Sequence, residues 1–438
     1  LAPYFSEFAL MRNRFRVEVE WLITALRRLP SSGIPELSEE QIATFRSWIT
    51  NFSLADARQI KQIEVRTRHD VKAVEYYLRQ RLIEAGCSPF APLVHVCCTS
   101  EDINNIAHAL MLREGLFDVW RPALDRTIAA LVALARPHLA TPMLARTHGQ
   151  PASPTTLGKE LAVFVARLRR QRAQLDKLVF WGKFSGAVGN FNAHVSAYPD
   201  VDWLRTAREF LAGFGLEMQI ATTQIEPHDY MAEVFHLVIR INSILIDLNR
   251  DIWSYISLGY LRQKLYPGEV GSSTMPHKIN PIDFENAEAN AGVSTAILEH
   301  LAVRLPISRM QRDLSDSSAI RTVGTGIGHS LLALKGCLAG LNKVDVDAGE
   351  MARDLDRNWA VLGEAIQTVM RKQGVEDAYE RIKAVTQNNP LDATILRSIV
   401  EEAGIGEPDR TYLLSLTPSS FVGLAHKIGE AALAENDD

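Results

Sequence analysis

The sequence lacks the features that mark membrane, secreted and disulfide-bonded proteins. Its 438 residues contain no apolar run close to the ~20 residues that span a bilayer. The start, Leu1–Phe5, shows no basic region followed by an apolar stretch, so we predict no signal peptide. The four cysteines follow no disulfide or metal-ligand spacing: Cys87, Cys97, Cys98 and Cys337. We therefore expect reduced, buried thiols and a cytoplasmic protein.

Signals for nucleic-acid, dinucleotide and metal binding are also missing. The formal net charge is −5, which disfavours nucleic acid and acidic membranes as partners. There is no Walker phosphate loop and no His-Glu-x-x-His motif. The glycine run at 186–189 lacks the spacing and the strand-turn-helix context of a dinucleotide fingerprint. A hydrophobic content of 47% and a charged content of 23% are those of an ordinary globular protein.

What the sequence does contain is helical periodicity. Apolar residues recur at helical spacing over residues 100–136, 157–178, 233–263, 283–303 and 317–341. Helices this long exceed the mean of about 11–12 residues and need partners along their length, which favours an all-α bundle and association of subunits. Strand signals are weak, and residues 186–198 are the best candidate for irregular or short extended structure. We predict a helical domain over 1–98, a long-helix bundle over 99–346 and a third helical domain over 347–438.

One loop between two long helical segments is unusually rich in reactive groups. Residues 267–281 carry three prolines and two glycines, which exclude regular structure. Within nine residues they offer two serine hydroxyls, an imidazole, an ammonium and an amide, together with flexible backbone N–H groups. Such a loop can hold an anion if a rigid scaffold supports it.

Five more polar clusters lie at expected helix ends, at residues 67–72, 98–105, 146–154, 222–229 and 309–318. Each has a plain structural alternative: Thr99 and Ser100 as a helix cap, His69 as a structural histidine, and Arg312 in a surface ion pair. A bundle would nevertheless bring helix ends to common levels. The clusters supply cations and hydroxyls, which suit a substrate that bears several carboxylates or a phosphate.

The motifs resemble those of the fumarase/aspartase superfamily. The run GSSTMPHKIN at 271–280 is similar to the superfamily signature G-S-S-x-M-P-x-K-x-N. His277, together with TRHDVKAVEY at 67–76, TSEDINN at 99–105 and QIEPHDY at 224–230, is similar to the branch that cleaves adenylosuccinate, in its longer bacterial form. The resemblance covers nearly the whole chain. Members of this branch begin with further residues that include a phosphate-contacting Gly-Arg-Tyr segment, and this chain starts after that point.

The resemblance implies a three-domain, almost all-α fold and a homotetramer in which each active site is shared between subunits. The implied reaction is β-elimination of fumarate from adenylosuccinate, giving AMP, and from the succinyl-carboxamide intermediate of purine synthesis (SAICAR), giving AICAR. It implies no metal or organic cofactor. The alternatives are another lyase of the superfamily, such as one acting on argininosuccinate, and a structural relative without activity.

The resemblance also implies the roles of individual residues. Ser272 would remove the proton from carbon, with Ser273 as the rival, and His148 would protonate the leaving nitrogen. Lys278 would stabilise the charge that develops on the substrate carboxylate. The remaining expected substrate contacts are Arg68, His69, Asp70, Thr99, Ser100, Thr147, Gln224, Asn280, Asn286, Arg312, Ser317 and Arg321. The loop around residues 268–280 would close over the substrate.

Overall fold

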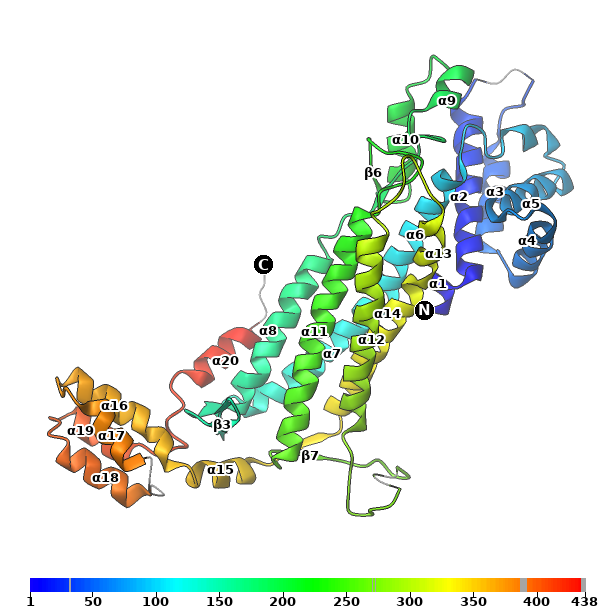
Figure 1. The fold of residues 1–438 in the computed structure, drawn as a ribbon. Helices are drawn as coiled ribbons and strands as arrows, with labels where there is room; N and C mark the ends of the chain where they lie inside the picture. Colours follow the sequence, from blue (N-terminus) through cyan, green and yellow to red (C-terminus); the bar gives the residue numbers. More distant parts are fainter. Residues whose placement is uncertain (31–32, 270, 272, 387–391, 435–438) are drawn as a thin grey trace. The chain divides into compact units, whose positions relative to one another are not determined.

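The computed structural model describes residues 1–30, 33–269, 271, 273–386 and 392–434. The chain is 67% helical, which confirms the predicted all-α class (Figure 1). In this described part no helix is long and apolar enough to cross a bilayer. All four cysteines are free thiols; Cys87 and Cys337 are buried as expected, whereas Cys97 and Cys98 are half-buried.

Helices fill most of the first third of the chain. They are α1 (Ala2–Phe5), α2 (Glu7–Arg28), α3 (Glu39–Thr50), α4 (Leu54–Thr67), α5 (Asp70–Glu84), the 3-10 helix η1 (Ser88–Leu93), α6 (Ser100–Gly115), the π-helix η2 (Leu116–Trp120), α7 (Arg121–Ala135) and the 3-10 helix η3 (Arg136–His138). Pro122 at the start of α7 has no backbone N–H to donate, and the widened π turn falls directly before it.

The longest helices follow. They and their connecting elements are α8 (Leu157–Leu175), α9 (Asn192–Ala197), α10 (Trp203–Ala212), α11 (Asp229–Ser257), α12 (Ile282–Arg304), α13 (Ser315–Ala319), the 3-10 helix η4 (Ile320–Thr322) and α14 (Val323–Leu341). The C-terminal elements are α15 (Ala348–Asp356), the 3-10 helix η5 (Trp359–Leu362), α16 (Gly363–Lys372), α17 (Ala378–Thr386), α18 (Ala393–Glu402), α19 (Asp409–Ser415) and α20 (Ala425–Leu433).

Strands are present but very short, and they were not predicted. They form the pairs β1 (Pro142–Met143) with β4 (Thr155–Thr156), β2 (Arg146–Thr147) with β3 (Gln150–Pro151), β5 (Trp181–Gly182) with β6 (Glu217–Met218), and β7 (Leu261–Gln263) with β8 (Val344–Val346). Only the β5–β6 pair is parallel among these described strands. Runs of two or three residues are too short to show an alternating pattern.

The five predicted long segments are all helical, but two of them are divided: residues 100–136 run through α6, η2, α7 and the start of η3, and residues 317–341 run through the end of α13, η4 and α14. The segment predicted over 233–263 is α11, which ends at Ser257 rather than Gln263. Gly259 has a φ of +75°, which ends the helix, and the following residues pair with β8 instead. Of the segment at 186–198, residues 192–197 form α9.

The chain divides by its internal contacts into two compact units. Unit 1 consists of Leu1–Ala123, Ala173–Asn242 and Asn290–Leu332, and unit 2 of Leu124–Arg172, Ser243–Ala289 and Ala333–Asp438. Unit 1 therefore combines the region predicted over 1–98 with parts of the predicted bundle, and unit 2 combines the rest of the bundle with the region predicted over 347–438. The three-domain division remains a prediction.

Unit 1 has a core of apolar side chains on its N-terminal helices. Phe15, Phe45, Tyr77 and Phe90 are buried in one cluster formed by α2 to α5 and η1. Helices α3 and α4 start with capping boxes, at Ser38 and Ser53 respectively. In unit 2, a separate apolar cluster joins the helices from η5 to α19, around Met370 and Leu396.

A chain of buried hydrogen bonds joins the long helices of unit 1. Trp120 Nε1 donates to Ser330 Oγ at 2.9 Å, and Ser330 Oγ donates to Asn242 Oδ1 at 2.8 Å. Asn242 Nδ2 then donates to Ser294 Oγ at 2.9 Å. Each of these four side chains is fully buried, so the bonds fix η2, α14, α11 and α12 side by side within this unit (Figure 1).

Replacing the central serine tests this chain of bonds. Ser330→Ala leaves the Trp120 indole N–H and the Asn242 carbonyl without their partner, and we expect the free energy of unfolding to fall by about 2–4 kcal/mol. The matched control is Ser254→Ala, on the exposed part of α11, where Ser254 Oγ donates to Arg250 O and a change within about 0.5 kcal/mol is expected. Denaturant titration followed by tryptophan fluorescence measures both. Equal midpoints for the two variants would contradict this view of the core.

Candidate active site

The clusters predicted at four helix ends come together in unit 1. Arg312 Nη2 lies 3.0 Å from Glu101 Oε1, and Arg312 Nη1 donates to Gln224 Oε1 at 3.1 Å. Gln224 Nε2 donates to Ala187 O at 2.9 Å, which fixes the orientation of the amide. Residues from α6, from the segment before α11 and from the segment before α13 thus form one connected polar group. The ion pair of Arg312 with the neighbouring Asp313, one alternative from the sequence, does not form.

Asp70 binds two further arginines beside this group. Its Oδ2 lies 2.8 Å from Arg14 Nη2 and 3.0 Å from Arg321 Nη2. Burial would raise the pKa of Asp70, but Arg14, the Val71 N–H and Arg321 together outweigh burial and lower that pKa below its usual range. Arg14 Nε also donates to Asn104 Oδ1 at 2.8 Å, and Asn104 Nδ2 donates to Glu101 Oε1 at 2.8 Å. Arg14 is therefore linked through Asn104 to Glu101, which Arg312 also contacts.

His228 is a buried histidine held between two carboxylates. Its Nδ1 lies 3.5 Å from Glu226 and its Nε2 3.8 Å from Asp316, which are ion-pair distances. Burial favours the neutral ring, but the carboxylates of Asp316 and Glu226 outweigh it and raise the pKa of His228 to about 9. The imidazolium therefore balances two acids close to Arg312.

The start of α6 is built on a fully buried ion pair. The helix begins at Ser100, and of the two candidate cap residues Thr99 is the cap. Asp102 accepts a hydrogen bond from Thr99 N at 2.8 Å, and its Oδ1 lies 2.8 Å from Lys183 Nζ. Both charged side chains are 0% exposed. Within the described chain, Ser100 Oγ has no hydrogen-bond partner and is available to a ligand.

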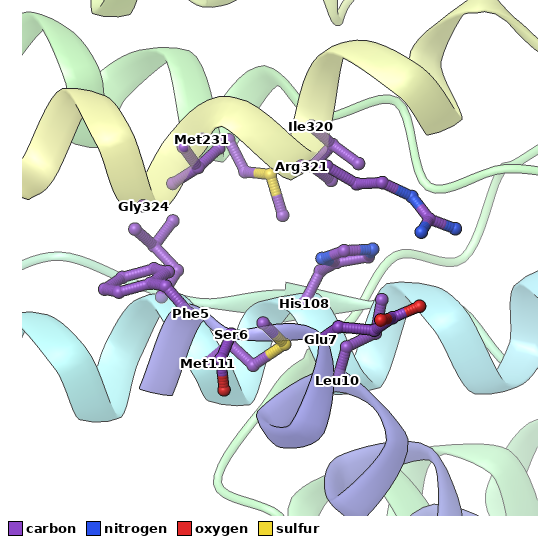
Figure 2. A pocket seen from close by; sticks show the side chains of 12 residues that line it. Phe5, Ser6, Glu7, Leu10, His108, Met111, Met231, Ile320, Arg321 and Gly324 are labelled. Atoms are coloured by element: carbon purple, nitrogen blue, oxygen red, sulfur yellow. The ribbon is translucent and has the colours of Figure 1, made fainter. Parts of the chain in front are cut away.

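A cavity of about 110 Å³ opens beside Arg321. Figure 2 shows Phe5 and Gly324 at one end of it and His108 and Arg321 at the other. Burial and the Arg14 charge lower the pKa of His108 to about 3, so its imidazole is neutral. In the part of the chain that the structure describes, the ring has no hydrogen-bond partner.

His69 caps α5 with its ring. Its Nδ1 accepts a hydrogen bond from Lys72 N at 3.2 Å, so the neutral ring carries its proton on Nε2. The side chain is half exposed, which leaves Nε2 open to a ligand. The structural role considered from the sequence is therefore real, and it leaves one nitrogen for binding.

Arg68 and Ser317 also lie in unit 1, whereas the remaining predicted site residues that the structure describes belong to unit 2. Thr147 and His148 lie on the hairpin of β2 and β3, where His148 and Gly149 are the two turn residues. Their φ angles are +53° and +75°, the positive values that a type I′ turn requires at both positions. This turn exposes the imidazole of His148 at the hairpin tip. Arg146 anchors the base of the hairpin to the Asp354 carboxylate, which also accepts a bond from Tyr260.

The described residues of the signature loop form no helix or strand, as predicted, and they lie in unit 2. Its ends meet where Asn280 N donates to Gly271 O at 3.4 Å. The Lys278 side chain is exposed, and it forms no ion pair with any described residue. Asn286 is exposed on the first turns of α12. Ser272, the predicted base, lies outside the described residues.

Strained backbone marks the same motifs. Non-glycine residues with positive φ occur in or beside the polar clusters at Arg68, Cys97, His148, His228 and Met310. Such conformations cost about 1–3 kcal/mol each and persist where surrounding contacts impose them. The strain therefore supports a functional reading of these segments. The described residues include no group of three His, Cys, Asp or Glu side chains that could hold a metal.

Several residues of the unit 1 group were not predicted as site residues. Arg14, Lys183 and His228 all make ion pairs inside it. A signal for Arg14 was present, because helical spacing puts it on the same face as the apolar Leu10 and Val17. Lys183 gave no such signal, since its partner lies 81 residues earlier in the chain.

Comparison with known proteins identifies the family. A family model described as "Lyase" matches residues 4–295, and one described as "Adenylosuccinate lyase C-terminal" matches residues 308–422. The chain is 46% identical over 435 residues to the adenylosuccinate lyase of Legionella pneumophila (strain Corby), covering 98% of this chain and 95% of that protein. It is 45% identical over 426 residues to the enzyme of Escherichia coli (strain K12), covering 97% and 93%.

Solved structures show the same fold in more distant proteins. A fumarate lyase from Mesorhizobium sp. BNC1 has a TM-score of 0.79 at 21% identity, covering 98% of this chain and 96% of that one. The 3-carboxy-cis,cis-muconate lactonizing enzyme from Pseudomonas putida has a TM-score of 0.75 at 23% identity, covering 98% and 94%. At these identities the likeness concerns the fold alone. The family models and the relatives matched over nearly their full length show that the chain belongs to the adenylosuccinate lyases of the fumarase/aspartase superfamily.

Proposed function

We propose that this chain eliminates fumarate from adenylosuccinate to give AMP, and from SAICAR to give AICAR. The observation that carries the proposal is identity of about 45% to adenylosuccinate lyases along 97–98% of the chain. The grouping of Thr99, Ser100, Gln224 and Arg312 around one helix start supports it, because those groups suit an anionic substrate. The reaction places the protein in purine biosynthesis, and it needs no metal or organic cofactor.

Elimination begins with removal of a proton from the carbon next to a carboxylate. The negative charge that develops spreads onto that carboxylate and must be met by a cation and by oriented N–H donors. Lys278 is the cation of the signature loop, and its exposed ammonium is available for this task. Ser272 is the base. Its hydroxyl needs the loop N–H groups and the nearby cation to exist as an alkoxide, and the same argument applies to its rival, Ser273.

Departure of the purine nitrogen requires a proton donor. An imidazole titrates near neutral pH and suits the donor role. His148 is the candidate because the hairpin turn holds its ring in solvent, where a substrate can reach it. Thr147, next to it on the hairpin, contacts the substrate in this proposal.

The unit 1 residues bind the substrate. Thr99 and Ser100 hold a carboxylate, and Gln224 contacts the substrate near the scissile bond. Arg312, Ser317 and Arg321 bind the phosphate or ribose, and Arg68, His69 and Asp70 complete the nucleotide end. In unit 2, Asn280 and Asn286 position the substrate or the signature loop.

We further propose a cytoplasmic homotetramer in which residues of different subunits complete each active site. Exposed apolar side chains on the long helices support association. Val293 and Val303 on α12 are 46% and 62% exposed, and Leu332 on α14 is 53% exposed. Side chains of this kind, at positions along the bundle helices, are suited to contact with a second copy.

Assay of the reaction itself is the primary test of the proposed function. The purified protein should convert adenylosuccinate into equimolar AMP and fumarate, followed by ultraviolet absorbance and by chromatography of both products. Argininosuccinate, offered under the same conditions, should remain intact. Cleavage of argininosuccinate alone would assign the chain to the other lyase, and cleavage of neither would favour a structural relative.

Single variants test the two proton-transfer residues. Ser272→Ala and His148→Ala should each lower kcat by about 10²–10⁴-fold, the usual contribution of a general base or acid, with the assembly unchanged in size. Ser273→Ala is the matched control and should stay within about tenfold of the wild type. Steady-state kinetics and size-exclusion chromatography provide the readouts. If Ser273→Ala is the inactive variant, the base is Ser273 instead.

Mixing inactive variants tests the sharing of sites. His148→Ala and Ser272→Ala subunits, dissociated and reassociated together, should regain about a quarter of the wild-type activity if the two residues of one site come from different subunits. Each variant carried alone through the same treatment is the control. Absence of recovery in a mixture whose hybrid tetramers are verified by mass spectrometry would place both residues of a site in one subunit.

A further inference from the structure

The first turn of α6 presents an electrostatic difficulty for the proposed function. Thr99 and Ser100, the proposed carboxylate-binding residues, are followed directly by Glu101 and Asp102, which are 4% and 0% exposed. These two carboxylates already interact with the positive end of the helix dipole. A substrate carboxylate that arrives here would therefore be repelled unless both acids are neutralised.

Each acid is paired with a cation, but only one of the two cations is accessible to a ligand. Glu101 is paired with Arg312 at 3.0 Å, and Arg312 belongs to the proposed substrate contacts. Asp102 is paired with Lys183 at 2.8 Å, its only cation within 4 Å among the described residues. Lys183 is 0% exposed, so it neutralises Asp102 without being able to touch a ligand.

The same pair fixes the backbone around the proposed binding groups. Asp102 accepts hydrogen bonds from Thr99 N at 2.8 Å and from Ser185 N at 2.9 Å, in addition to Gly186 N at 3.1 Å. Lys183 Nζ donates to Gly186 O at 2.5 Å. One ion pair thus ties the start of α6 to the loop at 185–187.

That loop in turn carries Gln224. The carbonyl of Ala187 accepts the Gln224 amide at 2.9 Å, and Ser185 Oγ lies 3.1 Å from Thr222 Oγ1. Gln224 then accepts from Arg312, which returns to Glu101 on α6. The contacts form a closed circuit that joins the start of α6, the loop at 185–187 and Gln224, and Lys183 and Asp102 are its fully buried members.

Packing explains why Lys183 stays in place. The neighbouring Phe184 ring lies 4.4 Å from Trp21 and 4.8 Å from Phe210, centroid to centroid. Asn105 holds the Lys183 backbone from both directions, accepting from its N–H and donating to its carbonyl at 2.8 Å each. A buried ion pair seldom stabilises a fold more than apolar residues of equal volume would. The ion pair here does what apolar residues could not. Asp102 accepts hydrogen bonds from the backbone, and Lys183 neutralises the charge of its carboxylate.

We propose that Lys183 is a positioning residue for substrate binding: by neutralising Asp102 it makes the start of α6 receptive to a substrate carboxylate, and it holds Thr99, Ser100 and Gln224 in register. The inference rests on the proposed function. It concerns the carboxylate end of the substrate and predicts no role at the nucleotide end.

Fumarate and AMP, used separately as inhibitors, probe the two ends. In Lys183→Met, the inhibition constant of fumarate should rise about 10–100-fold, because an unpaired charge now lies beside the carboxylate site. The inhibition constant of AMP should stay within about threefold. Lys61→Met is the matched control: Lys61 pairs with Glu7 and Glu64 on the exposed surface of unit 1, and neither constant should change.

The double variant Lys183→Met/Asp102→Asn separates charge from structure. It carries no unpaired buried charge, but it lacks the hydrogen bond from Lys183 to Gly186 O and one acceptor oxygen of Asp102, so fumarate inhibition should recover to within about tenfold of the wild type. If Lys183→Met does not fold, as judged by circular dichroism, the double variant carries the test with the same readout. Loss of fumarate inhibition in the double variant with AMP inhibition retained would overturn the proposal.

Three further outcomes are decisive. Equal weakening of fumarate and AMP in Lys183→Met would assign Lys183 to general support of the fold and overturn the positioning role. Failure of the wild type to cleave adenylosuccinate would overturn the proposed function and this inference together, whereas a cleaving wild type and a Lys183→Met variant with unchanged fumarate inhibition would overturn this inference alone.

Discussion

The ion pair between Lys183 and Asp102 is the contact on which the polar framework of unit 1 depends. It is fully buried, so its two charges must satisfy one another and the surrounding backbone. Asp102 accepts from the start of α6 and from the loop at 185–187, and Lys183 closes that loop from inside. The remaining carboxylates of the group repeat this arrangement with other cations: Asp70 with two arginines, Glu101 with Arg312, and Glu226 with His228. The result is a dense set of charges with little net charge, into which an anion can be admitted.

The two units carry different parts of the proposed chemistry. Unit 1 contains the buried, mutually paired groups that suit binding, and their partners hold them in fixed orientations. Unit 2 contains His148 at a hairpin tip and Lys278 in an irregular loop, both exposed in the single chain. Groups that transfer protons must meet the substrate at its reacting atoms, and exposed positions on short turns allow this. Binding groups benefit from rigidity, and proton-transfer groups benefit from access.

Much of the helical fold could be predicted from the sequence, and the predictions that failed did so for physical reasons. The spacing of apolar residues such as Phe235, Leu245 and Ile252 was sufficient to predict α11, because a long helix repeats its pattern many times. The strands were missed because two or three residues cannot show a period. The end of α11 was placed too late, since the role of Gly259 depends on a φ of +75° that the periodicity does not reveal. Thr99, rather than Ser100, is the cap for a similar reason: both residues have the right chemistry.

The candidate site, like the fold, could be predicted only in part. Motifs that are continuous in sequence, such as those around His69 and Gln224, were recognisable, and the structure brings the unit 1 members together. Ion pairs between residues far apart in the sequence could not be predicted. Lys183, which pairs with Asp102 81 residues earlier in the chain, was therefore missed. The most direct test of the account is a crystal structure of the assembled protein with AMP and fumarate bound. The account predicts that one fumarate carboxylate is hydrogen-bonded by Thr99 or Ser100 with the Lys183–Asp102 pair intact behind it; fumarate bound away from the start of α6 would contradict it.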